Sequence, residues 1–286
     1  MSDGTKLKLT LLGCGASGGV PRLGGADGSG NWGNCDPANP KNRRRRCALL
    51  VERAGPNGVT RVLVDAGPDI REQLLSARVT GLDAVLFTHD HADHTHGLDD
   101  LRLVFFLIRR KIPSWADERT REILFDRFGY AFETPPGSSY PAILEHNLIA
   151  EDPARGPGRY QPIRIEGAGG AIEALPFATP HGRFDALGFR FRNAGRDVVY
   201  LPDVNEMSDA AWEAVEGLDL WLLDALRYEP HPTHANLDTA LSWIERAQPR
   251  RAVLINMNIE LDYERVAAET PAHVTPAHDG MVVEVG

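Results

Sequence analysis

The stretch FTHDHADHTHGLDD, residues 87–100, constrains this chain most. It places four histidines and four aspartates in fourteen positions directly after the apolar run DAVL. Side chains of an extended strand repeat every second residue, so His89 and His91 point the same way, and Asp93 and His94 follow where a helix would begin. Imidazole nitrogens and carboxylate oxygens are ligands of Zn, Mn and Fe, and buried imidazoles need partners. The pattern therefore favours a metal site over a charged surface loop.

The rest of the chain alternates short apolar runs with turn residues. Strands are expected in KLKLTLLG, CALLVER, TRVLVDAG, DAVLFT, PIRIEG, AIEALPFATPH, LGFRFRNA, DVVYLPD, LDLWLLDA and RAVLINM. Helices are expected in PDIREQLLSARV, GLDDLRLVFFLIRR, SDAAWEAVEG and NLDTALSWIERAQP. This order is typical of one layered α/β domain with its helices outside. We expect a single domain over residues 1–286, with an insert or lid segment at about 113–160, where proline and glycine are frequent.

Charge and composition narrow the class of protein. The formal net charge of −9 argues against a nucleic-acid partner, which would call for a basic face. No apolar run approaches the roughly 18 residues of a membrane span, and the first residues lack the pattern of a signal peptide. The three cysteines, Cys14, Cys35 and Cys47, form no even framework. We therefore expect a cytoplasmic protein with no membrane partner, and the sequence leaves a homodimer open.

The pattern His-x-His-x-Asp-His resembles the signature of the metallo-β-lactamase fold hydrolases. The segments LLGCGASGGVPRLGG, LVDAG, the signature itself, a later lone histidine, YLPD and HDGMVVEVG follow in that family's order. Within the family the chain resembles the branch of the phosphoribosyl 1,2-cyclic phosphate phosphodiesterase (the PhnP family), and the tRNA 3′-processing endonucleases more distantly. The resemblance implies an αβ/βα four-layer sandwich of two mixed β-sheets with metals at one sheet edge.

The resemblance also implies a set of metal ligands. His89, His91 and His181 would hold the first metal, Asp203 would bridge, and Asp93 and His94 would hold the second. Asp203 follows the apolar run VVYL. The alternative role for Asp203 is to cap the helix expected in SDAAWEAVEG, although Ser208 is the more natural cap of that helix. Asp65 ends another apolar strand and is either an acceptor that orients a ligand histidine or an ordinary turn aspartate.

Further residues are candidates for catalysis and substrate binding. By the resemblance, His234 lies where the phosphodiesterase branch has a proton donor or substrate contact, a role that an imidazole can fill near neutral pH. His231 is expected to be loop scaffolding or an outer contact, and His96 either lines the pocket or lies on a helix face. Positive charge for the substrate is expected from Arg22, from the run 43–46, or from Arg102. The alternative to substrate binding for residues 43–46 is that they form a charged strand edge that aids solubility.

Two features depart from the phosphodiesterase pattern. Asn256 stands where that branch has the last histidine ligand of the second metal, and an amide oxygen is a weaker ligand. The second site is therefore expected to bind loosely, to favour Mn over Zn, or to use another ligand. Cys35 and Cys47 form no Cys-x-x-Cys pair, so we expect no structural zinc and ordinary buried cysteines.

These observations predict a binuclear metal-dependent hydrolase, with two Zn or Mn ions and with Fe as a further option. The expected reaction is attack of a metal-bridging hydroxide on a small, cyclic or nucleotide-like phosphodiester, with Asp93 and His234 as catalytic residues. The expected partner is a small anionic phosphate-containing substrate. Hydrolysis of a carboxyl ester, lactone or thioester at the same site is the alternative. A nucleotide-binding protein with a weakened second metal site is another.

Overall fold

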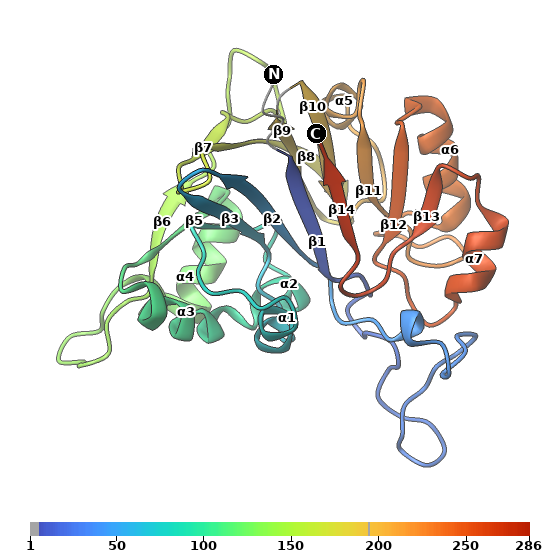
Figure 1. Ribbon diagram of the computed structural model, residues 1–286, viewed down its shortest axis with the longest axis horizontal. Helices are drawn as coiled ribbons and strands as arrows, with labels where there is room; N and C mark the ends of the chain where they lie inside the picture. Colours follow the sequence, from blue (N-terminus) through green and yellow to red (C-terminus); the bar gives the residue numbers. More distant parts are fainter. Residues whose placement is uncertain (1–5, 194) are drawn as a thin grey trace.

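The computed structural model, which describes residues 6–193 and 195–286, consists of two seven-stranded sheets that face one another (Figure 1). The first sheet has the order β14 (Val282–Val285), β1 (Leu7–Gly13), β2 (Ala48–Gly55), β3 (Gly58–Val64), β4 (Ala84–Leu86), β5 (Ile112–Ala116), β6 (Leu144–Leu148). The second has the order β13 (Val274–Pro276), β12 (Arg251–Ile255), β11 (Leu220–Asp224), β10 (Arg196–Leu201), β9 (Phe184–Asn193), β8 (Ile172–His181), β7 (Ile163–Ile165). Each sheet mixes antiparallel pairs with a run of parallel strands, β3 to β6 and β10 to β13.

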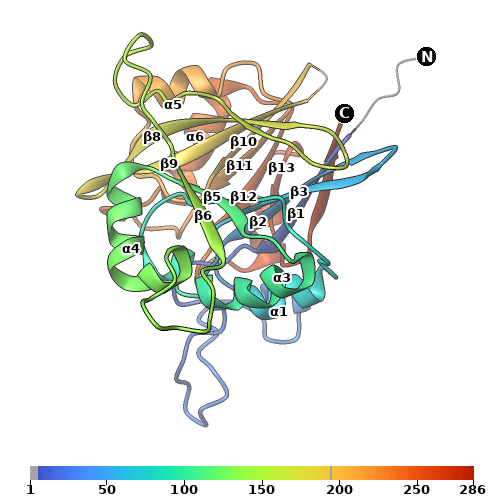
Figure 2. The same ribbon diagram turned by 90° about the vertical axis from the view of Figure 1, so that its left-hand side faces the viewer.

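Helices cover the outer faces of both sheets, giving four layers (Figure 2). They are α1 (Ile70–Ser76), α2 (Ala92–Thr95), α3 (Leu101–Ile108), α4 (Glu118–Phe132), α5 (Asp209–Ala214), α6 (Leu237–Ala247) and α7 (Tyr263–Glu269). The pleat divides each strand between two cores. In β2, Leu49 and Val51 face the second sheet, while Ala48 and Leu50 pack with residues of α1, α3 and α4. The predicted metallo-β-lactamase sandwich of two mixed sheets is thus confirmed.

Local signals explain where several helices begin. Asp117, Ser208 and Asn236 are the N-caps of α4, α5 and α6, and each side chain accepts a hydrogen bond from a backbone N–H in the first turn. Ser208 is therefore the cap that the sequence favoured, and Asp203 is free for another role. The helix expected across residues 97–110 divides into a short 3-10 turn (Leu98–Asp100) and α3.

The segment at about 113–160 contains more regular structure than the sequence indicated. Most of β5, the whole of α4 and β6 lie within it, and β5 and β6 complete the edge of the first sheet by parallel pairing. The segment is thus largely part of the layered domain. A lid function for its remaining loops stays a prediction. In the ranges 6–193 and 195–286, the helices are all too short or too polar to cross a membrane.

Candidate metal centre

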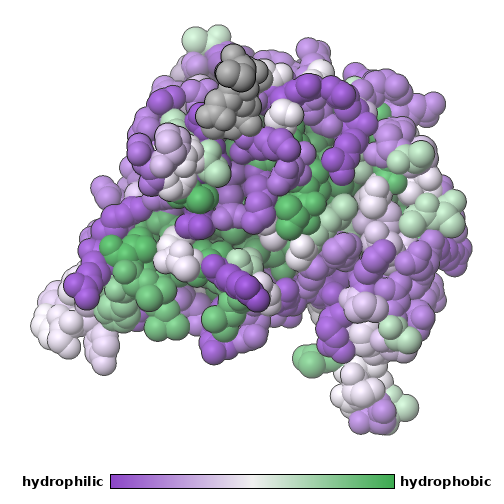
Figure 3. Space-filling view, viewed as in Figure 1, coloured by the Kyte–Doolittle hydropathy of each residue, from purple (hydrophilic) through white to green (hydrophobic). Residues whose placement is uncertain are grey.

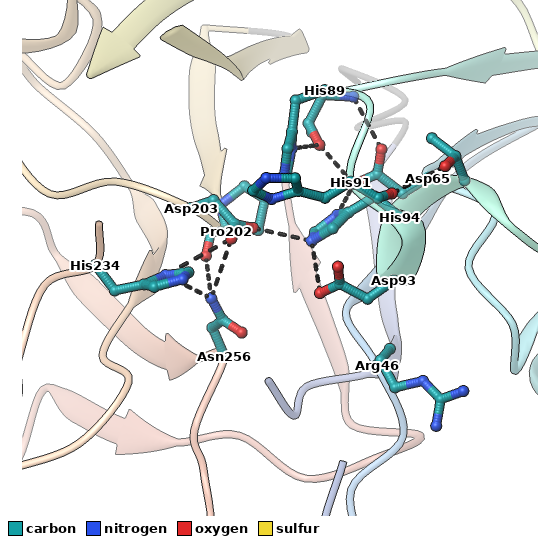
Figure 4. A network of polar contacts seen from close by, with 12 residues as sticks. Arg46, Asp65, His89, His91, Asp93, His94, Pro202, Asp203, His234 and Asn256 are labelled. Carbon is teal, nitrogen blue, oxygen red and sulfur yellow. Dashed lines mark hydrogen bonds and ion pairs between the residues drawn. The ribbon is translucent and has the colours of Figure 1, made fainter. Parts of the chain in front are cut away.

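The predicted site residues meet where strands of both sheets end (Figure 4). Asp65 follows β3, His89 lies three residues beyond β4, His181 ends β8, Asp203 lies two residues beyond β10, Asp224 ends β11, and Asn256 follows β12. Parallel strands present their carboxyl ends at the same edge of a sheet, and ligands in α/β folds bind beyond such ends. The order of the strands therefore creates the cluster from distant parts of the chain.

The signature itself supplies four of the side chains. His89 is fully buried, and the backbone is still extended at His91, which precedes α2 as its N-cap. Asp93 and His94 lie on α2, as the sequence predicted. The rings of His89 and His91 approach to 4.6 Å between centroids, so the two side chains do share one side of the chain.

The first half of the cluster consists of His89, His91 and His181. One nitrogen of each ring lies within 4.8 Å of the other two. His181 Nε2 is 3.3 Å from His91 Nδ1, although the two residues are 90 positions apart. Three imidazole nitrogens that converge in this way form a donor set typical of zinc and related divalent metals.

Neighbouring groups orient the histidines. The Thr88 hydroxyl donates to Asp65, so its oxygen accepts from His89 Nδ1 at 3.0 Å. His181 Nδ1 lies 2.7 Å from the carbonyl oxygen of Thr233 and donates to it. With Nδ1 protonated in both rings, the lone pair of each Nε2 faces the cluster, which is how surrounding groups fix the tautomer of metal-binding histidines.

The second half of the cluster consists of Asp93 and His94, and Asp203 lies between the two halves. His94 Nε2 is 3.1 Å from Asp203 Oδ2 and 3.4 Å from Asp93 Oδ2. Asp203 Oδ1 is 3.7 Å from His181 Nε2 on the other side. The opposite ring atom, His94 Nδ1, lies 2.7 Å from Asp65 Oδ2. Asp65 is therefore an acceptor that orients a histidine of the cluster, which resolves the alternatives that the sequence left open.

The two halves differ in charge. Burial, together with the nearby His94, lowers the pKa of His89 well below its ordinary value. Burial also opposes a charged imidazole at His94. There, however, the surrounding carboxylates, led by Asp203 and Asp93, raise the pKa well above its ordinary value. Without a bound cation, positive charge is thus stabilised in the second half and disfavoured at His89.

Among the described residues, three buried atoms of the cluster make no hydrogen bond of normal geometry: His89 Nε2, His94 Nε2 and Asp203 Oδ2. The last two lie 3.1 Å apart as an ion pair, whereas His89 Nε2 has no such contact. Leaving a buried polar atom unpaired costs about 1–3 kcal/mol, so such atoms are rare in folded proteins. His89, His94 and Asp203 also form a group whose donor atoms lie within 4.8 Å of one another. A divalent cation would pair with all three, so the residues present fit a metal centre.

Asn256 acts as a hydrogen-bond donor in this structure. Its Nδ2 donates to the carbonyl oxygen of Pro202 at 2.8 Å and lies 3.5 Å from Asp203 Oδ1 (Figure 4). The amide group thus supports the turn that carries Asp203 and presents its nitrogen, which cannot ligate a metal, to the cluster. Its backbone φ of 60° is one that Asn adopts more readily than most residues.

His234 lies beside the cluster and contacts a carboxylate that the sequence analysis did not single out. His234 Nδ1 is 2.9 Å from Asp224 Oδ2. Burial opposes the charged ring, but the carboxylates of Asp224 and Asp203 raise the pKa of His234 to about 9. Asp224 could have been found in the sequence, because it follows the apolar run LDLWLL just as Asp203 follows VVYL.

A cavity of about 220 Å³ opens over Asp93, Asp203 and His234. Two guanidinium groups line it, and neither has a carboxylate partner among the described residues. Arg22 packs over Gly18, where an added Cβ would lie 3.1 Å from the arginine Nε. Arg227 donates to the carbonyl oxygens of Glu229 and Pro230. The cavity therefore combines acidic metal-binding groups with uncompensated positive charge.

The other cations proposed from the sequence lie elsewhere. Arg45 and Arg46 pair with Asp279 and Asp69, and Arg102 pairs with Asp99. Arg43 lies over the ring of Trp32 and is the one exposed member of the run 43–46. The alternative for residues 43–46, a charged strand edge that aids solubility, does not describe most of them. These residues precede β2, and three of the four are at least partly buried.

Arg44 is buried and connects the glycine-rich loop to the segment after β12. Its guanidinium donates to the carbonyl oxygens of Asn258 and Leu261 at 3.2 and 2.8 Å. It also contacts the thiol of Cys35, and all three cysteines are free and buried, as the sequence predicted. His96 is exposed, lies against Phe128 and is absent from the cavity lining. His231 does line the cavity, and its Nδ1 accepts from the backbone N–H of Thr233.

The family model described as the beta-lactamase superfamily domain matches residues 60–257, which is more than half of the chain. The chain therefore belongs to the beta-lactamase superfamily, as its signature predicted. Within the superfamily it is similar to a solved diphosphatase of the PhnP family, with 31% identity, a TM-score of 0.80, and coverage of 98% of this chain and 97% of that one. This similarity confirms the resemblance to the PhnP branch.

Curated relatives have other activities in their names. The chain is 28% identical to an octanoyltransferase of Porphyromonas gingivalis over 96% of its own length, but it spans only about half (51%) of that protein. It is 26% identical to the coenzyme PQQ synthesis protein B of Pseudomonas putida, over 77% of this chain and 74% of that protein. The family is thus shown, while the relatives differ in activity.

Proposed function

We propose that this protein is a binuclear metal-dependent hydrolase that cleaves a small phosphodiester, either cyclic or nucleotide-like. One observation carries the proposal: the cavity over the His/Asp cluster is lined by two guanidinium groups, Arg22 and Arg227, that have no carboxylate partner within residues 6–193 and 195–286. Guanidinium is well suited to phosphate oxygens, because its planar donors match them in geometry and charge. The positive charge of these two arginines lies beside the acidic cluster in a chain that is acidic as a whole. The cavity is therefore suited to an anionic substrate.

The cluster provides ligands for two divalent ions. His89, His91 and His181 would hold the first, Asp93 and His94 the second, and Asp203 would contact both. Zn or Mn suits this mixture of imidazole and carboxylate, and Fe is compatible with it. When bound, such a pair supplies Lewis acidity toward a phosphoryl group and a nucleophile that is available at neutral pH.

The protein's own side chains would position the substrate and handle the proton. Arg22 and Arg227 would hold the anionic group, which fixes the phosphorus over the cluster. Asp93, which lines the same cavity, would orient the attacking group. His234 would protonate the departing oxygen, and Asp224 would hold its ring in place through Nδ1.

The similarity to a diphosphatase over nearly the whole of both chains supports phosphoryl chemistry. The octanoyltransferase relative gives one reason to keep an acyl substrate as the second candidate, because octanoyl transfer concerns an acyl group. The two guanidinium groups favour the phosphate, since an acyl ester or thioester carries no charge at the reacting group. The free buried thiols fit a reducing compartment, and we propose the cytoplasm.

Activity on a substrate panel tests the proposal. Protein loaded with Zn or Mn is assayed on bis-p-nitrophenyl phosphate, a cyclic nucleotide, an organic diphosphate, a lactone and an acyl thioester. We expect turnover of the phosphodiesters. Arg22→Met and Arg227→Met should each raise KM for them by about tenfold or more, the loss expected for a charge-assisted contact. Arg164→Met is the matched control, because Arg164 is exposed on β7 and pairs with Glu166. Turnover of the lactone or thioester alone would overturn the proposal.

A further inference from the structure

The two longest helices over the first sheet present different side chains to their surroundings. α3 exposes Leu103, Phe106 and Leu107, which contribute to the hydrophobic area at the lower left of Figure 3, where Figure 1 draws this helix. α4 packs its apolar face on β5 and β6, and two of its arginines, Arg119 and Arg127, reach the metal-binding signature. The segment that the sequence favoured as an insert therefore contacts the metal centre through charged groups.

The residue that these arginines contact is Asp90, which separates His89 from His91. The two histidines share one side of the chain, so Asp90 between them lies on the other side, against α4. Asp90 is only 5% exposed. Its carboxylate pairs with Arg119, and one of its oxygens lies 3.7 Å from Arg127 Nη2. A carboxylate at this depth is costly without such partners, which distinguishes Asp90 from a solvated surface charge.

Arg127 also holds the main chain at this point. Its Nη1 donates to the carbonyl oxygen of Asp90 at 2.7 Å. The guanidinium therefore contacts both the side chain and the backbone of the residue between two candidate metal ligands. The peptide group that joins Asp90 to His91 is thereby fixed from outside the cluster.

Arg119 reaches the first half of the cluster by a second route, through Phe184. Phe184 is the first residue of β9 and the register partner of His181, and Figure 2 draws α4 beside the hairpin that joins β8 to β9. The guanidinium of Arg119 lies 3.9 Å from the centre of the Phe184 ring. That ring lies 5.1 Å from the ring of His91 and 5.7 Å from that of His181, nearly perpendicular to both. A cation–π contact thus holds an aromatic ring against two of the three imidazoles.

Asp90 also balances charge next to the first half. Its carboxylate lies against two guanidinium groups and compensates one of the two positive charges. Without the carboxylate, both positive charges would remain beside the three imidazoles that must hold a cation. Like charges repel strongly in a partly buried site, where solvent screens them little, so metal binding there would weaken.

We propose that α4 positions the first half of the cluster, with Asp90, Arg119 and Phe184 as positioning residues. Arg127 and Asp90 fix the backbone between the two histidines of the signature, and Arg119 holds Phe184 against the ring of His91. The inference rests on the metal centre of the proposed function but not on its substrate. Outer contacts of this kind orient metal ligands, and their loss weakens metal affinity. α4 is thereby part of the frame of the metal site.

Binding of Co²⁺ to the full chain tests the role of Asp90, because the visible absorption of this ion changes with its ligand geometry. Asp90→Asn keeps the volume and should weaken one of two bound ions by about tenfold and change its absorption. Asp65→Asn should weaken mainly the other ion. Asp126→Asn is the matched control and should change neither, because Asp126 is an exposed residue of α4 with no ion pair in the ranges 6–193 and 195–286. Unchanged binding and absorption in Asp90→Asn, or weakening of the same ion by Asp90→Asn and Asp65→Asn, would overturn the proposal.

Replacement of the aromatic ring tests the second route. Phe184→Ala removes the contact that holds His91, so it should weaken the same ion as Asp90→Asn several-fold and change the same absorption. Phe184→Leu, which keeps most of the volume, is measured in case Phe184→Ala fails to fold. Phe184→Tyr keeps the ring and should restore both the affinity and the absorption. A loss of stability in Phe184→Ala and Phe184→Leu with unchanged Co²⁺ absorption would show a merely structural role and overturn the assignment of Phe184.

The Co²⁺ measurements need no substrate, so the inference and the proposed function fail separately. A wild type that binds two ions, responds to Asp90→Asn as expected and cleaves no phosphodiester would overturn the proposed function and support the role of α4. A wild type that cleaves phosphodiesters while Asp90→Asn binds both ions as before would support the proposed function and overturn the role of α4.

Discussion

The first half of the cluster consists of imidazoles alone, whereas carboxylates dominate the second half. His89 and His181 each have a hydroxyl or carbonyl partner that turns Nε2 inward. His94 is surrounded by Asp65, Asp93 and Asp203, and the expected further imidazole is replaced by Asn256, which donates a hydrogen bond. Two of the three imidazoles in the first half are therefore held with Nε2 toward the cluster by groups outside it. The second half depends on the negative charge of its carboxylates to attract a cation. Its metal affinity should therefore change more than that of the first half when a surrounding side chain is substituted.

The largest expected effect comes from removing a shared imidazole. His89 belongs to donor groups in both halves. His89→Ala should therefore abolish activity, by more than about a thousandfold, and lower the bound metal toward zero. Elemental analysis of the purified protein measures this loss. His96→Ala, which changes an exposed histidine outside the cavity, should keep its metal. Full metal content in His89→Ala would break the assignment of both halves.

A smaller effect, greatest in the second half, is expected from Asp65→Asn, because Asp65 contacts His94 directly and His89 only through Thr88. The substitution removes the anionic acceptor of His94 Nδ1 but keeps the volume. Loss of such an outer partner typically weakens metal affinity by about 10–100-fold. Titration with Mn or Zn should show clearly greater weakening for one of the two ions than for the other. Asp99→Asn is the control, since Asp99 pairs with Arg102 on the surface. Equal weakening of both ions would contradict the division into halves.

Asn256→His should strengthen the second half by about tenfold in affinity, or about 1.4 kcal/mol of binding free energy. Histidine tolerates a positive φ better than most residues, so the backbone at this position is compatible with it. Metal binding followed by calorimetry measures the gain. Asn258→His is the comparison variant: Asn258 also lines the cavity, but its Oδ1 accepts from the backbone N–H of Glu260, so the gain should be smaller. Tighter binding of both ions in Asn256→His would instead indicate a general effect on the fold.

The smallest expected effect on metal binding comes from Arg44→Met. This change removes two hydrogen bonds from a buried guanidinium to the segment that follows Asn256. Unfolding in urea should show a loss of about 2–3 kcal/mol of stability, since charged groups donate strong hydrogen bonds and the carbonyls are left unpaired. Affinity of the first half should stay unchanged. Arg43→Met is the control, because Arg43 is exposed.

Part of the site could be predicted from residue order because its chemistry is local. The spacing of His89, His91, Asp93 and His94 places them at the end of one strand and the start of one short helix, and the structure keeps them there. His181 and Asp203 came from the family resemblance, because a lone histidine or aspartate at a strand end is common. The sequence around Asp65 fits both a turn aspartate and a histidine partner, and only the 2.7 Å distance to His94 Nδ1 distinguishes the two.

Other predictions depended on contacts that no local pattern encodes. Besides Arg22, the sequence offers Arg102 and the run 43–46 as substrate-binding cations. None of these five lines the cavity. Arg227 does line it, and no sequence pattern predicted this. The prolines and glycines of the segment at about 113–160 favour an insert, but they lie mainly in the loops before and after β6. The pairing of β5 and β6 with the first sheet is visible only in three dimensions.

The sequence by itself determined the class of fold, the metal-binding signature and the alternation of apolar runs that forms two sheets. These follow from short-range periodicity, which is set by backbone geometry. Tertiary structure decided which carboxylates surround His94, that Asn256 donates to the carbonyl oxygen of Pro202, and which arginines of residues 6–193 and 195–286 have no carboxylate partner. Those outcomes depend on distances below about 4 Å between residues far apart in the chain, and the order and register of the strands set such distances.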